Sequence, residues 1–182
     1  RSRGLGDVYK RQNIYFEKSS VKYDLFQKDK INAVRHGDTN FKKILGHRYE
    51  SIFIGSNTNT VIEGGKKINS YHNYFIGKDS TNWKSRVPLY SEIKYIDVYK
   101  NIDVKYYSSG GKLKYDFTIH PKSSTENIKI KYVGIDSIYI KSGHLILKTS
   151  LGNVIEQAPL AYQVINERKQ TIPCEYLSLI HI

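Results

Sequence analysis

The chain of 182 residues carries a formal net charge of +12 and contains 16 tyrosines, 4 prolines and one cysteine, Cys174. A lone cysteine excludes a disulfide framework or a cysteine-based zinc site within the chain, and no apolar run is long enough to cross a membrane as a helix. The abundance of tyrosine, isoleucine and valine favours strands over helices.

The two ends differ in character from the rest of the chain. Residues 1–12, RSRGLGDVYKRQ, and residues 177–182, LSLIHI, resemble translated sequencing-adapter read-through, and the sequence has no methionine. We expect both ends to be artefacts or disordered and exclude them from the fold prediction. The remaining segment, 13–176, has the length of one β-rich domain with its own core.

Short segments in which apolar and polar residues alternate run through the chain, separated by polar turns, while the stretch 29–43 has the character of a loop. Such alternation is typical of half-buried strands. The series predicts an all-β fold with little helix, as an antiparallel sandwich or a barrel, and we expect a β-sandwich of many short strands and hairpins. The expected strands are 14–18, 21–26, 46–55, a short strand ending in a turn within 61–66, 87–96, 102–107, 113–120, 128–133, 137–140, 144–149, 153–156, 159–165 and 170–176. The first two strands are expected to form a hairpin, and the last two a final hairpin around a polar turn at 166–169.

The clearest single pattern is the hairpin Asn101–Pro121, whose two alternating arms flank a turn with paired glycines. Paired glycines can adopt the positive φ angles that tight turns require. One register sets Lys105 against Asp116 and Tyr106 against Tyr115, whereas the neighbouring register opposes two aspartates. Because opposite charges and aromatic pairs contribute roughly 0.2–1 kcal/mol each across strands, we predict the first register.

An aromatic run, Tyr71–Trp83, precedes the hairpin. We expect it to be a strand or extended chain, with Asp79 or Ser80 capping a single helical turn that carries Trp83. Rings clustered in this way suit a sugar or a protein partner, although packing in the core or at a sheet edge is the interpretation that residue types favour. The candidate contact residues for a partner or glycan are Tyr71, Tyr74, Trp83 and Tyr90.

No spacing typical of a metal or catalytic centre occurs in the sequence. The histidines show neither H-x-x-x-H nor H-E-x-x-H spacing, and no nucleophile elbow G-x-S-x-G is present. The pairs Gly64-Gly65 and Gly110-Gly111 are predicted to be turns rather than phosphate-binding loops. We therefore expect no metal and no cofactor.

Four carboxylates deserve a separate test against glycosidase chemistry, which needs two carboxylates flanking a cleft. The interpretation we favour is that they are strand-end and solvent-face charges paired with lysines, so we expect no enzyme activity. The four residues are Glu92, Asp97, Asp103 and Asp116.

The order of several motifs resembles one domain family. These motifs are FIGSN at 53–57, NYFIGKD at 73–79, YKNIDVKYY at 99–107, LKYDF at 113–117 and PLAYQ at 159–163. The family is the uncharacterised all-β domain found near the N-terminus of large secreted Bacteroidetes-type proteins, which often carry SBBP (β-propeller) repeats, PKD-type modules and a gliding-motility-associated or secretion domain. The resemblance implies export and a secreted or cell-surface location, with downstream domains of the same polypeptide as partners.

Two functional hypotheses follow. The first is a non-catalytic β module of a large secreted or cell-surface protein, acting in adhesion, display or assembly, with a cell-envelope glycan or protein as a further partner. The alternative is a glycan-binding or glycan-cleaving domain, which requires exposed aromatics and, for cleavage, paired carboxylates. We do not expect a nucleic-acid partner, because the lysines alternate with apolar residues as on solvated strand faces, for example at Lys129 and Lys131.

Overall fold

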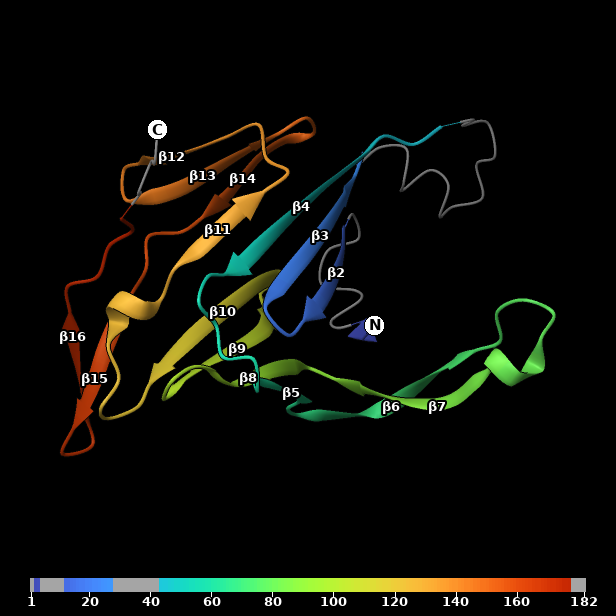
Figure 1. Ribbon diagram of the computed structural model, residues 1–182, viewed down its shortest axis with the longest axis horizontal. Helices are drawn as coiled ribbons and strands as arrows, with labels where there is room; N and C mark the ends of the chain where they lie inside the picture. Colours follow the sequence, from blue (N-terminus) through green and yellow to red (C-terminus); the bar gives the residue numbers. More distant parts are fainter. Residues whose placement is uncertain (1, 4–11, 28–42, 178–182) are drawn as a thin grey trace. The chain divides into compact units, whose positions relative to one another are not determined.

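The computed structural model describes residues 2–3, 12–27 and 43–177. Within these ranges the regular elements are strands and two short 3-10 turns, and every strand pair is antiparallel, which confirms the all-β prediction (Figure 1). In the same residues no helix has the length and apolar character needed to span a membrane. The predicted loop 29–43 lies almost wholly outside the described residues.

The chain divides into two compact units, an N-terminal unit of residues 1–133 and a C-terminal unit of residues 134–182. The single domain expected over 13–176 stays a prediction. The segment 1–12, which the fold prediction excluded, contributes a two-residue strand and the first residue of the next strand, and its other residues lie outside the described ranges.

One sheet of the N-terminal unit has the strand order β1-β2-β3-β4-β11. The predicted hairpin at its centre is confirmed as β2 and β3, and the predicted strand beginning at Gly46 buries Tyr49 and Phe53 on one face. Alternation explains the arrangement, since residues two apart share a face of the sheet. The strands are β1 (Ser2–Arg3), β2 (Gln12–Glu17), β3 (Ser20–Phe26), β4 (Gly46–Phe53) and β11 (Ile130–Val133).

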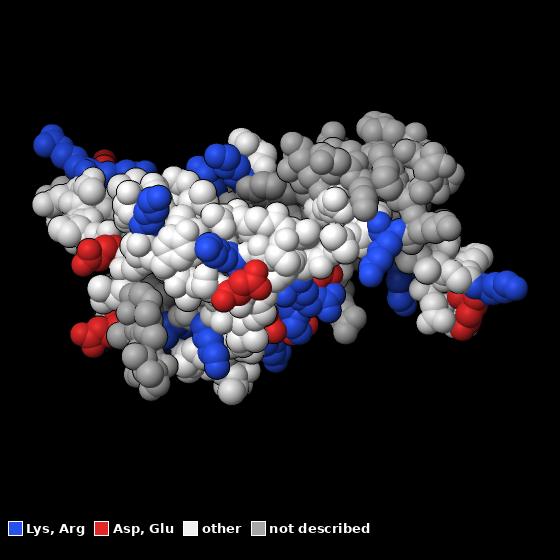
Figure 2. Space-filling view, turned by 90° about the horizontal axis from the view of Figure 1, so that it is seen from above, with Lys and Arg blue, Asp and Glu red and all other residues white. Residues whose placement is uncertain are grey.

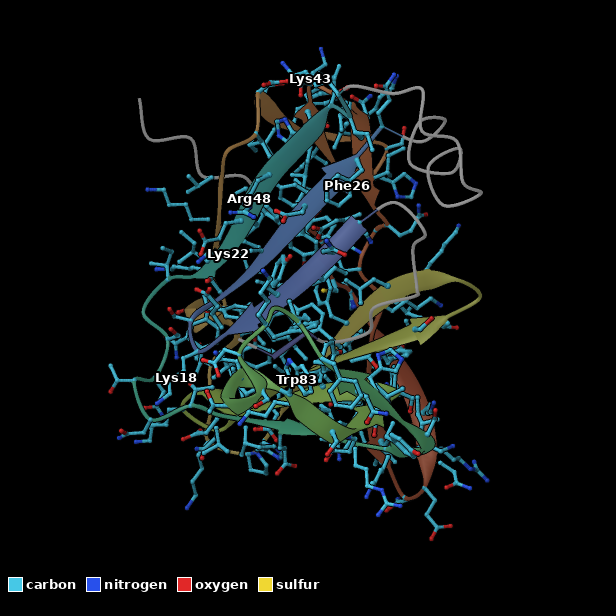
Figure 3. All side chains as sticks on the ribbon, turned by 90° about the vertical axis from the view of Figure 1, so that its right-hand side faces the viewer. Lys18, Lys22, Phe26, Lys43, Arg48 and Trp83 are labelled. Carbon is cyan, nitrogen blue, oxygen red and sulfur yellow. The ribbon has the colours of Figure 1, made fainter. Side chains whose placement is uncertain are left out.

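The opposite face of this sheet carries paired charges. Lys22 and Arg48 lie along the same face of β3 and β4 (Figure 3). The Lys22 Nζ lies 2.7 Å from a carboxylate oxygen of Glu17, and the guanidinium of Arg48 forms an ion pair with Asp24. Charges of both signs therefore offset one another on this solvated face.

A second sheet of the N-terminal unit has the order β10-β9-β8-β5. The hairpin of β9 and β10, at one edge of this sheet, confirms the predicted register: Asp116 pairs with Lys105, and Tyr115 pairs with Tyr106. The Lys105 Nζ lies 3.7 Å from Asp116 Oδ2, so the charge pairing that selected this register is present. The strands are β5 (Val61–Gly64), β8 (Glu92–Tyr99), β9 (Ile102–Ser109) and β10 (Lys112–Ile119).

The inner rings of the two sheets contact each other around Tyr95, which is fully buried. Its ring centroid lies 5.5 Å from that of Phe53, 6.0 Å from that of Tyr106 and 6.3 Å from that of Phe16. Its hydroxyl donates a hydrogen bond of 2.9 Å to the backbone oxygen of Glu17, so the one polar atom of this side chain is satisfied. Burial raises the pKa of the Tyr95 phenol.

The prediction of one continuous strand over 87–96 is wrong, because the structure has two strands there, β7 (Lys84–Tyr90) and β8. The break falls at Ser91, whose backbone N–H and Oγ both donate to the backbone oxygen of Lys66. On one side of the break Leu89 pairs with β6 (Lys67–Tyr74), and on the other side Ile93 pairs with β5. The alternating pattern continues through this change of partner and therefore does not reveal it.

The prediction of turns at the two glycine pairs is confirmed for Gly110 and Gly111, both of which have positive φ. It is wrong for Gly64, which is the last residue of β5 and pairs with Ile93. A Cβ at Gly64 would lie 2.5 Å from both Cδ atoms of Tyr90, so only glycine lets that ring lie on the strand.

In the C-terminal unit a three-stranded sheet of order β12-β13-β14 buries the side chains Leu145, Ile146 and Leu147, and a separate two-stranded sheet follows. The predicted final hairpin is present, but its turn is shorter than predicted. Asn166 and Glu167 both have positive φ, as the tight two-residue turn of a hairpin requires, so the second strand already starts at Arg168. The strands are β12 (Ser137–Lys141), β13 (His144–Thr149), β14 (Gly152–Glu156), β15 (Ala161–Ile165) and β16 (Arg168–Ile172).

Candidate functional site

The candidate site is a two-stranded antiparallel ribbon of β6 and β7, residues 67–90, called the ribbon below. Figure 1 shows its strands running out from β5 and β8 in green to the 3-10 turn η1 (Ser80–Asn82). Pro88 is tolerated in β7, because a two-stranded ribbon has free strand edges where the missing N–H costs nothing. The pairing shifts register between Ile68 and Tyr71 and again between His72 and Tyr74, and such bulges redirect side chains.

The ribbon exposes large apolar side chains to solvent. Tyr71 is 53% exposed, Phe75 59% and Trp83 42%, in contrast to the buried rings around Tyr95. Ile76, at 68%, adds to this area. Contiguous exposed apolar area rimmed by polar residues is typical of interaction sites.

Hydrogen bonds hold the tip of the ribbon. Asp79 Oδ1 accepts from the backbone N–H and the hydroxyl of Thr81, at 3.0 and 2.7 Å, and its Oδ2 accepts from Asn82 Nδ2 at 2.9 Å. This confirms the predicted single turn, with Asp79 as its N-cap and Trp83 directly after it. An ordered tip presents the indole in one place, which reduces the entropy lost on binding.

The indole itself is fixed by two contacts. Trp83 Nε1 donates to the backbone oxygen of Gly77 at 3.2 Å, and the ring lies edge-to-face against Phe75, with centroids 5.4 Å apart and planes at 63°. Figure 3 shows Trp83 on the ribbon. The nitrogen is thus satisfied within the chain, and the apolar part of the ring remains available for contact.

The tip should lose order in acid. Hydrogen bonds from Thr81 hold the pKa of Asp79 below its usual value of 3.8. Because the pKa is depressed in the folded tip, the carboxylate stabilises the turn fully above that usual value, and this contribution is lost as pH falls through the lower folded pKa. We expect a shift in Trp83 fluorescence emission only below about pH 4.

An Asp79→Asn variant tests this cause, because an asparagine oxygen can still accept from Thr81 but does not titrate. The acid shift in Trp83 emission should disappear in the variant. An unchanged acid transition in Asp79→Asn would show that another group controls it.

The four predicted contact residues differ in their exposure to solvent and in their place on the ribbon. Tyr71 and Trp83 are exposed on the ribbon, whereas Tyr74 is half-buried, with its hydroxyl 3.5 Å from His72 Nδ1. Tyr90 lies at the base of the ribbon, where its ring packs on Gly64. The exposed rings of the site are therefore at the tip and in β6, and Tyr90 helps to anchor the ribbon.

Sequence reasoning missed Phe75, Ile76 and Arg86. Arg86 has a φ of 54°, and its backbone N–H donates to Asn73 Oδ1 at 2.8 Å. Its guanidinium carbon lies 5.9 Å from the centroid of the Tyr71 ring, within reach of a cation–π contact. The signal available in the sequence was the run Tyr-Phe-Ile followed by glycine, which puts three large apolar residues at a turn.

Two of the four candidate glycosidase carboxylates stabilise the β8–β9 connection. Asp97 Oδ1 accepts from the backbone N–H of Asn101 at 2.7 Å, and Asp103 Oδ1 accepts from the backbone N–H of Asp97 at 2.7 Å. Asp103 Oδ2 also lies 2.8 Å from His120 Nε2. Hydrogen bonds thus give both groups structural roles.

The other two carboxylates are also engaged. Asp116 pairs with Lys105 and accepts from the hydroxyl of Tyr107, and Glu92 Oε1 accepts from the backbone N–H of Lys66 at 3.2 Å. Within the described part of the chain, the expected pairing with lysine is present for Asp116 and not for the other three. Among the described residues no group of three His, Cys, Asp or Glu side chains could hold a metal ion.

Two open hollows lie on the described surface of the N-terminal unit, and neither brings two carboxylates together. One is lined by β3 and β4 residues from Asp24 to Phe26 and from Gly46 to Arg48. The other lies near the 3-10 turn η2 (Thr125–Asn127) and has a volume of about 380 Å³. It is lined by Ile54, Gly55, Tyr99, Lys100, Asn127 and Lys129.

Lysine and arginine side chains occupy several separate places on the face shown in Figure 2, with white and red residues between them. A duplex-binding surface needs cations gathered along one stripe. The expectation that no nucleic acid binds the chain stays a prediction.

Antiparallel strands, tight turns and an exposed aromatic ribbon define an all-β domain with a candidate binding surface. Residues 8–179 match the family described as a domain of unknown function (DUF7948), and the chain belongs to that family. No curated protein and no solved structure matches the chain. The resemblance to an uncharacterised all-β domain is confirmed to this extent, and the SBBP, PKD-type and secretion modules around it stay a prediction.

Proposed function

We propose that this domain is a non-catalytic binding module of a large secreted or cell-surface protein, and that it acts in adhesion, display or assembly through the ribbon. The observation that carries this proposal is the exposure of Phe75 and Trp83 at an ordered tip and of Tyr71 in β6. Apolar area removed from water contributes about 25 cal/mol per Å², so a partner that covers these rings gains affinity without any chemical step.

The scaffold for this surface is a β-sandwich in our proposal. Support comes from the ring contacts that Tyr95 of one sheet makes with Phe16 and Phe53 of the other. Two sheets packed face to face would hold the base of the ribbon rigidly.

The partners we propose are downstream domains of the same polypeptide and a cell-envelope glycan or protein. A sugar ring has apolar faces that pack on aromatic side chains, as the exposed indole of Trp83 would allow. The alternative of a glycan-cleaving domain would need two carboxylates roughly 5–9.5 Å apart across a cleft. The hydrogen bonds of Asp97 and Asp103 within the chain favour binding over cleavage.

A binding assay with the whole 182-residue chain tests the proposal. The chain would be titrated with cell-envelope polysaccharides by calorimetry and assayed for turnover of glycoside and ester substrates. We expect binding without turnover, and Trp83→Ala combined with Tyr71→Ala should weaken binding about thirtyfold or more, as for residues at the centre of an interface.

The matched control is Tyr162→Ala, because Tyr162 is 51% exposed on the β15–β16 ribbon of the C-terminal unit. This variant should bind as the unaltered chain does. The proposal fails if the double variant binds normally, or if turnover persists through purification and vanishes when one aspartate or glutamate is replaced.

A further inference from the structure

The ribbon carries a local excess of positive charge. Four cationic side chains lie within residues 67–90, and all four are exposed. The only acidic residue in the same segment is Asp79, whose carboxylate oxygens accept hydrogen bonds from Thr81 and Asn82. The four cations are Lys67, Lys78, Lys84 and Arg86.

These cations differ from Lys22 of β3 and Lys105 of β9. Lys22 and Lys105 pair with carboxylates of neighbouring strands, whereas among the described residues none of the four ribbon cations lies within ion-pair distance of a carboxylate. An exposed cation without a partner leaves its full charge available to a ligand.

The cations are also interleaved with the exposed rings. Lys84 follows Trp83 directly, and the guanidinium of Arg86 lies 5.9 Å from the Tyr71 ring centroid. A ligand that packs on either ring would therefore place its substituents near a positive charge.

We propose that the ligand of the ribbon is an acidic polysaccharide, a polymer whose sugar rings pack on Trp83 and Tyr71 while its carboxylate groups bind Lys84, Arg86 and the neighbouring lysines. This inference rests on the proposed function, since it names the class of glycan that the same surface binds. Arginine suits the role, because its planar guanidinium can bind a carboxylate through two parallel hydrogen bonds.

A single-stranded nucleic acid also combines anionic charge with flat rings. The angles between the aromatic rings of the ribbon favour a polysaccharide over this alternative. Successive bases need aromatic platforms on which they stack one after another. On the ribbon Phe75 and Trp83 meet edge-to-face at 63°, and His72 and Tyr74 at 66°, so neighbouring rings do not form parallel platforms. A sugar needs only one ring at a time.

The test compares polygalacturonate with its methyl ester, which keeps the sugar backbone and loses the charge. At about 0.05 M salt the full chain should bind polygalacturonate at least about tenfold more tightly, and raising salt to about 0.3 M should remove most of this preference by screening. The variant Lys84→Gln with Arg86→Gln should lose the preference. The control Lys112→Gln with Lys114→Gln, which removes two exposed cations of β10, should keep it.

Equal, salt-independent binding of both polymers would overturn the inference and leave the proposed binding module intact. Tighter binding of an oligothymidylate than of polygalacturonate would overturn it in favour of a nucleic acid. Absence of binding to every polysaccharide would overturn it together with a glycan-binding role. Circular dichroism and Trp83 emission of each variant would show that the fold is kept.

Discussion

Replacing Tyr95 by alanine should lower the free energy of unfolding of the N-terminal unit by about 3–5 kcal/mol. The side chain is fully buried, and its ring contacts Phe16, Phe53 and Tyr106 from two sheets. Alanine would leave a cavity where these rings meet and would remove the donor to the backbone oxygen of Glu17. Urea unfolding followed by far-ultraviolet circular dichroism measures the change.

A second variant at Tyr95 separates the contribution of the ring from that of the hydroxyl, and a variant at Tyr162 is the control. Tyr95→Phe keeps the ring and removes the hydroxyl, so it should cost about 1–3 kcal/mol, because the backbone oxygens of Glu17 and Ser20 lose their donor. Tyr162→Ala, at an exposed tyrosine, should change stability by about 0.5 kcal/mol or less. If Tyr95→Ala costs no more than Tyr162→Ala, the contact between the two sheets does not hold the unit together.

Replacing Gly64 by alanine should destabilise the chain by about 1–3 kcal/mol, although only one methyl group is added. The new Cβ would lie 2.5 Å from both Cδ atoms of Tyr90. The ring of Tyr90 is held at the junction of β7 and β8. Relieving the clash between the new Cβ and this ring would therefore require a backbone shift where the ribbon joins β5 and β8.

Gly46→Ala is the matched control. Its Cβ would lie 3.4 Å from the backbone oxygen of Leu25, which is close to ordinary contact, and Gly46 has no positive φ. Urea unfolding of both variants should show a clearly larger loss for Gly64→Ala. Equal losses would mean that the packing of Tyr90 on Gly64 does not constrain the junction.

Local pairing is what the sequence predicts well. The register at Lys105 and Asp116 follows from charges and rings on two arms that are adjacent in the chain, and the structure confirms it. The Asp79 cap is also predicted correctly, because its hydrogen bonds reach only two or three residues ahead.

Features that depend on distant partners are what the sequence does not reveal. The break at Ser91 arises because the chain leaves β6 for β5, and the need for glycine at position 64 arises from the ring of a residue 26 positions later, Tyr90. Both are contacts between strands whose pairing alternation alone does not specify.

The residues of the candidate site also divide into those that the sequence predicts and those that depend on contacts between strands. Aromatic content identified Tyr71 and Trp83, and both are exposed to solvent in the structure. It did not distinguish them from Tyr90, whose ring packs on a neighbouring strand. Arg86 was missed because its proximity to Tyr71 depends on the pairing of β6 with β7 and on its positive φ. Exposure, unlike residue type, is set by the whole fold.

Binding through the ribbon is tested most directly by a hydrogen-exchange footprint of the full chain with and without bound polygalacturonate, read by mass spectrometry. We expect slower exchange in residues 67–90, centred on the turn before Trp83, with no change on the β15–β16 hairpin or around the hollow lined by Lys100 and Lys129. Protection confined to that hollow or to the C-terminal unit, with the ribbon unchanged, would contradict it.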